Sequence, residues 1–129
     1  MNVEQQVTYW RTGSDEDWDM VEIALEKGKI RHGLFFLHLA IEKLLKAHIC
    51  RVTGGYPPKI HDLIRLTKQA ELDVSEAWLL LLGRMNAFCL IGRYPGNPTA
   101  QNISIDVAYR YLHDAQEVRA WLQQTLFSP

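Results

Sequence analysis

One uninterrupted stretch, residues 34–50 (LFFLHLAIEKLLKAHIC), constrains the fold more than any other part of the chain. It contains neither glycine nor proline, so nothing in it interrupts a helix. Its apolar side chains would cover about half of the circumference of such a helix; they are Phe36, Leu37, Ala40, Ile41, Leu44, Leu45 and Ala47. Because a face that wide needs several neighbouring helices to cover it, the stretch is predicted to be the central helix of a bundle.

The same stretch carries a row of titratable side chains, His38, Glu42 and Lys46, spaced four residues apart. Two interpretations are open. In the first, the row is a surface stripe in which Glu42 and Lys46 pair at the favoured spacing, which contributes only about 0.2–0.5 kcal/mol. In the second, Lys46 and side chains from other helices bind a phosphate or a nucleotide.

The size and composition of the chain indicate a single globular domain over residues 1–129. Hydrophobic residues make up 47% and charged residues 22% of the chain, which argues against general disorder. The net charge of −1 gives no overall electrostatic attraction to nucleic acid, so any phosphate site must be local.

Several features predict a cytoplasmic protein outside the membrane. Cys50 and Cys89 lie in apolar helical surroundings far from a CxxC spacing, as expected for buried thiols in a reducing compartment. The N-terminal residues lack the basic and apolar regions of a signal peptide. The stretch 34–50 is too short and too charged to span a membrane.

Hydrophobic periodicity predicts an all-α fold, a bundle of four to five helices. Local rules favour a break in the first helix at Gly13 and Ser14, with Ser14 as an N-cap. Ser75 and Ser104 are predicted to cap the last two helices. The expected helices cover residues 3–27, 30–52, 60–71, 77–91 and a final segment after Ser104.

Two loop segments carry further candidate residues. His61 and Asp62 follow a Pro-Pro loop and are either a helix-start pair or a pocket pair, with His61 as a hydrogen-bonding or acid–base group beside the central helix. Arg93 and Tyr94 precede Pro95 in a loop expected over residues 92–98. Arg93 either binds the last carbonyls of the preceding helix or offers a bidentate fork to phosphate.

No metal site and no cofactor are expected. The five histidines form no HxxxH or HExxH pair, so the common zinc spacings are missing. The sequence also lacks a GxGxxG motif, a P-loop and a nucleophile elbow, which argues against the common nucleotide-binding and hydrolase folds.

Five fragments, each weak alone, occur along nearly the whole chain in a recognisable order: Trp10 and Asp17, the block from His38 to Ala47, His61-Asp62-Leu63, Arg93-Tyr94-Pro95, and Trp121-Leu122. Their order and spacing resemble the HEPN family, the nucleotide-binding domain of higher eukaryotes and prokaryotes. The resemblance implies an up-and-down bundle of about five helices with one continuous first helix. It also implies a homodimer and, as a partner, a minimal nucleotidyltransferase in a toxin–antitoxin-like system.

Many members of the HEPN family are metal-independent ribonucleases that carry an arginine, then four to six other residues, and then a histidine. This chain departs from that pattern. No histidine follows Arg84 at that spacing, Arg93 is too far from His113, and Arg110 is too close to it. The ribonuclease signature is therefore missing at these three arginines.

The favoured function is a dimeric, non-catalytic HEPN module that binds a nucleotide or an RNA phosphate, regulates a nucleotidyltransferase partner, or does both. The expected ligand-binding residues are Lys46, His61, Arg93 and Tyr94, and the expected orienting residues are Glu42 and Asp62. One alternative is a metal-independent ribonuclease toxin that uses His61 or His113 with Arg93. A second alternative is a purely structural helical subunit.

Overall fold

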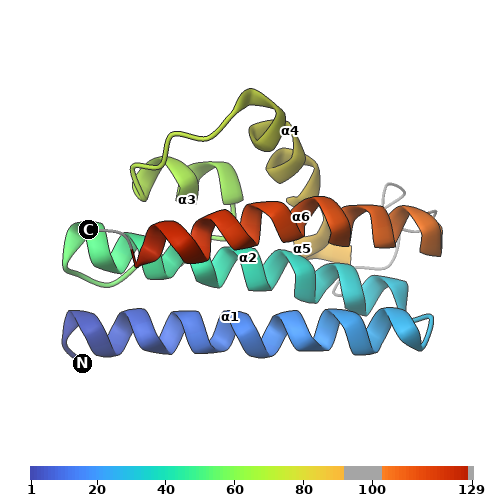
Figure 1. Ribbon diagram of the computed structural model, residues 1–129, viewed down its shortest axis with the longest axis horizontal. Helices are drawn as coiled ribbons and strands as arrows, with labels where there is room; N and C mark the ends of the chain where they lie inside the picture. The colour runs from blue at the N-terminus through green and yellow to red at the C-terminus, as the bar shows by residue number, and fades with distance from the viewer. Residues whose placement is uncertain (92–102, 128–129) are drawn as a thin grey trace.

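The computed structural model describes residues 1–91 and 103–127. These residues form helices and no strand (Figure 1), so the predicted all-α fold is confirmed for the described part of the chain. The helical segments are α1 (Val3–Glu26), α2 (Ile30–Thr53), α3 (Leu63–Gln69), α4 (Glu76–Met85), α5 (Phe88–Ile91) and α6 (Ile105–Leu126). Since α5 is a single turn, the bundle has the four to five helices that the sequence predicts.

The three long helices α1, α2 and α6 lie side by side, and α3, α4 and α5 together form a broken arm beside them (Figure 1). Along the chain, α1, α2, the broken arm and α6 run in alternating directions (Figure 1). This is the up-and-down order that the resemblance implies. Helix α2 contacts α1, α3, α5 and α6. The prediction that residues 34–50 form the central helix is therefore confirmed.

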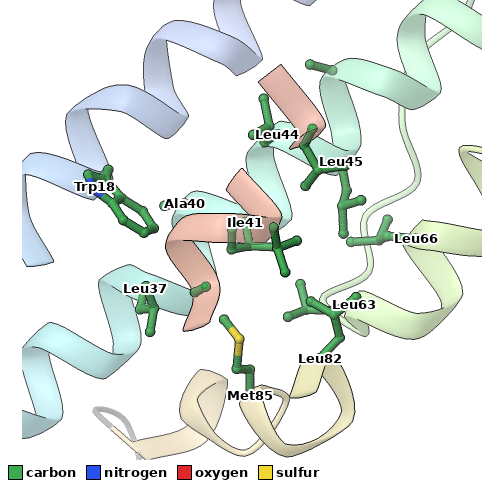
Figure 2. Packing of buried hydrophobic residues seen from close by; sticks show 14 of the residues in the cluster. Trp18, Leu37, Ala40, Ile41, Leu44, Leu45, Leu63, Leu66, Leu82 and Met85 are labelled. Atoms are coloured by element: carbon green, nitrogen blue, oxygen red, sulfur yellow. The ribbon is translucent and has the colours of Figure 1, made fainter. Parts of the chain in front are cut away.

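The hydrophobic core surrounds α2 on several sides (Figure 2). Trp18 reaches it from α1, Leu63 and Leu66 from α3, and Leu82 and Met85 from α4. All of these side chains are almost completely buried, as are the residues of α2 that they cover: Leu37, Ala40, Ile41, Leu44 and Leu45. This packing fixes α2 in one rotational position, and so fixes which of its polar side chains meet other elements.

Helix α1 runs unbroken through Gly13 and Ser14. The break that local rules predict is therefore wrong, and the continuous helix that the resemblance implies is confirmed. Ser14 is buried, and its Oγ donates a hydrogen bond to the backbone oxygen of Ala40 in α2 at 2.6 Å. A Cβ at Gly13 would lie 3.2 Å from Cδ of Lys43, so α1 and α2 approach closely here. This contact offsets the helical cost of glycine, about 1 kcal/mol.

The broken arm differs from the prediction in two places. Helix α3 begins at Leu63 rather than near residue 60, because Asp62 is its N-cap and accepts the backbone N–H of Ile64 at 3.0 Å. The single helix predicted over residues 77–91 is instead split into α4 and α5. The split follows Asn86, whose side-chain oxygen accepts the backbone N–H of Leu63 at 2.9 Å.

The predicted helix ends are otherwise largely confirmed. Ser75 and Ser104 cap α4 and α6, and each accepts a backbone N–H of the first helical turn. Helix α2 ends at Thr53 and is capped by Gly54, whose φ of 71° is the left-handed conformation that glycine favours. The loop predicted over residues 92–98 lies outside the described residues.

The two cysteines form no disulfide; Cys50 is buried and Cys89 is partly buried. Among the described helices, none is long and apolar enough to cross a membrane.

Candidate functional site

The polar row of α2 is buried, which corrects the surface-stripe interpretation. His38 is 1%, Glu42 3% and Lys46 5% exposed. The row lies inside because neighbouring segments cover it: Trp10 of α1 lies over Lys46, and the segment before α3 lies over His38 and Glu42. The helical wheel alone could not show that both sides of α2 are packed.

Glu42 is the centre of this polar cluster. Its Oε2 accepts a hydrogen bond from Nζ of Lys46 at 3.1 Å, and its Oε1 lies 2.9 Å from Nδ1 of His61. Nδ1 of His38 lies farther from the same Oε1, at 3.7 Å. A buried carboxylate is costly unless it is paired and hydrogen-bonded, and here each oxygen has a partner.

Lys46 is held on two sides. Besides its bond to Glu42, its Nζ lies 5.3 Å from the centroid of the Trp10 ring, within range of a cation–π contact. Its side chain is only 6% exposed. In this arrangement Lys46 neutralises Glu42 and does not extend into solvent.

His38 is a buried neutral imidazole. Its Nε2 lies 2.9 Å from the backbone oxygen of His61, and since a carbonyl only accepts, Nε2 carries the proton. Burial lowers the pKa of His38, and the nearby charge of Glu42 opposes that effect without reversing it. His38 therefore fixes the backbone of the segment before α3.

His61 is the exposed member of the cluster. Its side chain is 51% exposed, although its Nδ1 touches a carboxylate that is 4% exposed. Because an ionised carboxylate only accepts, Nδ1 is the donor and Nε2 is the nitrogen left for another partner. His61 thus connects the buried cluster to the surface.

Asp62 and Asn86 hold the segment that carries His61. The Oδ1 of Asp62 accepts the N–H groups of Ile64 and Arg65, at 3.0 Å and 3.4 Å, and also Nδ2 of Asn86, at 3.0 Å. The structure therefore shows Asp62 at the start of a helix and His61 beside α2 in contact with Glu42.

An open cavity of about 300 Å³ lies beside this segment, lined by His61, Asp62, Asn86, Cys89 and Leu90. The structure thus brings together Glu42, Lys46 and His61 from the predicted site, with Asp62 next to them. Arg93 and Tyr94 lie outside the described residues. His113 is elsewhere, on α6, with its side chain 75% exposed and its Nδ1 3.6 Å from Asp114.

Two residues of the site carry no signal in the sequence that would have placed them there. Asn86 stands near the end of an apolar helix, and its bonds to Asp62 and Leu63 depend on the fold. Trp10 appears only as a fragment of the family resemblance. Within residues 1–91 and 103–127, no group of three or more histidine, cysteine or acidic side chains is placed to hold a metal ion.

Comparisons with known proteins agree with this fold. A family model described as the HEPN domain matches residues 7–125. Among solved structures, TT1696 from Thermus thermophilus is similar with a TM-score of 0.75 and 18% identity, covering 92% of this chain and 97% of that one. At that identity the likeness shows the fold alone. No curated protein matches the chain significantly in sequence.

Proposed function

The chain belongs to the HEPN domain family, and from this premise we propose that it is a non-catalytic module that binds a nucleotide or an RNA phosphate. One observation carries the proposal. The half-exposed imidazole of His61 stands at an open cavity while its Nδ1 is held by the buried carboxylate of Glu42. An imidazole fixed in this way can meet a ligand without the entropy cost of ordering a free side chain.

The residues of the cluster then have different roles. His61 touches the ligand, and in its protonated form Nε2–H donates a charge-assisted hydrogen bond to a phosphate oxygen. Glu42 is a positioning residue that orients the imidazole. Lys46 acts through Glu42, since it is buried and paired. Asp62 and Asn86 hold the segment that carries His61.

Arg93 and Tyr94 remain part of the proposed site on sequence grounds. They follow Leu90, which lines the cavity, by three and four residues. A guanidinium fork suits phosphate oxygens, and a tyrosine ring suits stacking on a base.

Binding of two probes tests this proposal: adenosine monophosphate by calorimetry and a short fluorescein-labelled oligoadenylate by fluorescence anisotropy. His61→Gln is expected to weaken binding about tenfold, the value of one charge-assisted hydrogen bond. His113→Gln is the matched control, because it removes an exposed histidine on another helix. Its affinity should stay within about twofold of the unmodified protein.

Several outcomes would count against the proposal. Equal affinity of the His61→Gln variant and the unmodified protein would remove His61 from the site. Tight binding by the double variant Lys46→Ala/Arg93→Ala would show that these two residues are not part of the site. If neither probe binds, the module is not a nucleotide or RNA binder, and a purely structural subunit becomes the better account.

The Glu42–His61 pair also favours a second function, metal-independent RNA cleavage. An imidazole held through Nδ1 by a carboxylate is the arrangement of a general base, here for a ribose 2′-hydroxyl, with Arg93 on the scissile phosphate. His113 is the other candidate histidine. RNA cleavage in excess chelator that is lost in His61→Gln or in His113→Gln would establish this function in place of binding alone.

The proposal includes a homodimer and a minimal nucleotidyltransferase partner, both of which rest on the family resemblance. Analytical ultracentrifugation of the purified chain tests the dimer. Co-expression with a nucleotidyltransferase encoded beside it, followed by affinity purification, tests the partner. A monomer at all accessible concentrations, or separate elution of the two proteins, would contradict these parts of the proposal.

A further inference from the structure

A second cleft lies between α4 and α6, and it contains two arginines from different helices. It has a volume of about 170 Å³ and is lined by Leu81, Arg84, Val107, Arg110, Tyr111 and Asp114. Arg84 and Asn86 are two residues apart near the end of α4, about 200° around the helix axis at 3.6 residues per turn. This cleft and the His61 cavity therefore flank α4 on different sides.

Helical spacing explains why these side chains share one cleft. Arg84 follows Leu81 by three residues, and Arg110 follows Val107 by three, so each arginine stands beside an apolar residue of its own helix. Leu81 is only 9% exposed and belongs to the floor of the cleft. Asp114 follows Arg110 by four residues and adds one carboxylate to the rim.

Two aromatic contacts hold the walls of the cleft together. The rings of Trp78 in α4 and Trp121 in α6 meet edge to face with centroids 5.5 Å apart. Phe88 of α5 and Tyr111 of α6 make a similar contact at 5.0 Å. The first contact joins α4 to α6 and the second joins α5 to α6, so the helices that carry the lining residues are packed together by aromatic rings.

The two arginines lack an ion-pair partner among the described residues. In contrast, Arg11, Arg51 and Arg119 each lie within 4 Å of a carboxylate oxygen. The cleft is lined by two guanidinium groups and one carboxylate, that of Asp114, so its lining carries a net positive charge that raises the local concentration of anions. A bound anion would neutralise that charge.

The size of the cleft limits the ligand. Pockets that hold drug-sized molecules measure about 300–1,000 Å³, so this cleft suits one charged group rather than a whole nucleotide. Guanidinium forks match phosphate oxygens bidentately, and the hydroxyl of Tyr111 is a further donor. We propose that Arg84 and Arg110 form an anion site for a single phosphoryl group, distinct from the His61 site and independent of its function.

Nuclear magnetic resonance of the isotope-labelled protein, observing arginine Nε–H signals, tests this site with inorganic phosphate. Phosphate should shift the signals of Arg84 and Arg110. Arg84→Gln and Arg110→Gln should each weaken binding about tenfold. The matched control is Arg65→Gln, which removes the same charge from an exposed arginine of α3 outside the cleft and should have no effect. Asp114→Asn should strengthen binding, because it removes a negative charge from the rim.

The source of the phosphoryl group is resolved by repeating the titration with adenosine monophosphate and with a short oligoadenylate. Tighter binding of the oligonucleotide, with a salt dependence whose slope falls by about 0.7 in Arg84→Gln, would identify a backbone phosphodiester. Equal binding of phosphate and the monophosphate would identify a phosphate ester. Both results support the site.

Other results would overturn it. The proposal would be wrong if phosphate shifted the Nε–H signals of neither Arg84 nor Arg110. It would also be wrong if Arg65→Gln lowered the affinity for phosphate as much as Arg84→Gln and Arg110→Gln do. His61→Gln should leave phosphate binding at this cleft unchanged, so a failure here and a failure of the His61 site are distinguishable.

Discussion

Helix α2 carries two buried histidines, His38 and His48, that make the same kind of contact in different surroundings. Nε2 of His38 lies 2.9 Å from the backbone oxygen of His61, and Nε2 of His48 lies 2.8 Å from that of Leu122. Burial lowers the pKa of both imidazoles, so both are neutral at pH 7. Each one ties α2 to another segment of the chain.

The difference lies in the neighbouring charges. His38 stands beside Glu42, a buried carboxylate that also holds a half-exposed histidine. The charged neighbour of His48 is Arg51, which pairs with the exposed Glu4. A hydrogen bond from an imidazole to a backbone carbonyl is enough to connect two helices, as the contact between His48 and Leu122 shows. The buried carboxylate is therefore an extra cost that packing does not require, and we infer that it serves His61.

The largest expected effect on stability comes from removing the buried carboxylate of Glu42. Glu42→Ala should lower the free energy of unfolding by about 3–5 kcal/mol, because it leaves the ammonium of Lys46 buried without its carboxylate. Urea denaturation followed by circular dichroism measures this change. Glu4→Ala is the control, because it removes the carboxylate that pairs with Arg51, the charged neighbour of His48. Since Glu4 is 72% exposed, the loss of stability should be no more than about 1 kcal/mol. Similar losses of unfolding free energy in Glu42→Ala and Glu4→Ala would contradict the proposed difference between the surroundings of His38 and His48.

The second expected effect is a loss of stability in mild acid. Both histidines have a folded pKa below the ordinary value of about 6.5, so the unfolded chain binds more protons as the pH falls. Stability is therefore full above about pH 6.5 and declines below it, by at most about 1.4 kcal/mol per pH unit for each histidine. Denaturation at a series of pH values measures the decline.

Variants assign that decline to particular residues. His38→Gln and His48→Gln should each make the decline of stability with falling pH shallower. A decline of unaltered slope in His38→Gln and His48→Gln would show that these two imidazoles are not its source.

The smallest expected effect on stability is that of His61→Gln. The side chain is half exposed at an open cavity, so glutamine or water can replace its hydrogen bond to Glu42. The free energy of unfolding should fall by less than about 1 kcal/mol, as measured by urea denaturation. A loss as large as that of Glu42→Ala would mean that His61 serves the fold rather than a ligand.

The helices could largely be predicted from the sequence, because they follow from apolar spacing and capping residues. The central helix and the caps Ser75 and Ser104 needed no tertiary information. The break at Gly13 is wrong because local rules do not include the contact with Lys43. The split after Asn86 was missed because the side chain finds its partners on another helix.

The candidate site could be predicted only in part. The residues of the polar row were identifiable by their spacing, and the resemblance grouped them with His61 and Asp62. Burial was not predictable, because a row of three polar residues looks the same whether or not a neighbouring segment covers it. The partner of Glu42 also depends on where the chain turns before α3, which the pattern of residues 54–62 does not determine.

The central claim is that Glu42 acts on a ligand through His61. A double-mutant cycle with Glu42→Gln and His61→Gln, measured by anisotropy with the labelled oligoadenylate, tests it most directly. If the claim holds, both single variants bind weakly and the double variant binds no more weakly than His61→Gln alone. Losses that add in the double variant would contradict it, because they would mean that the two residues act independently.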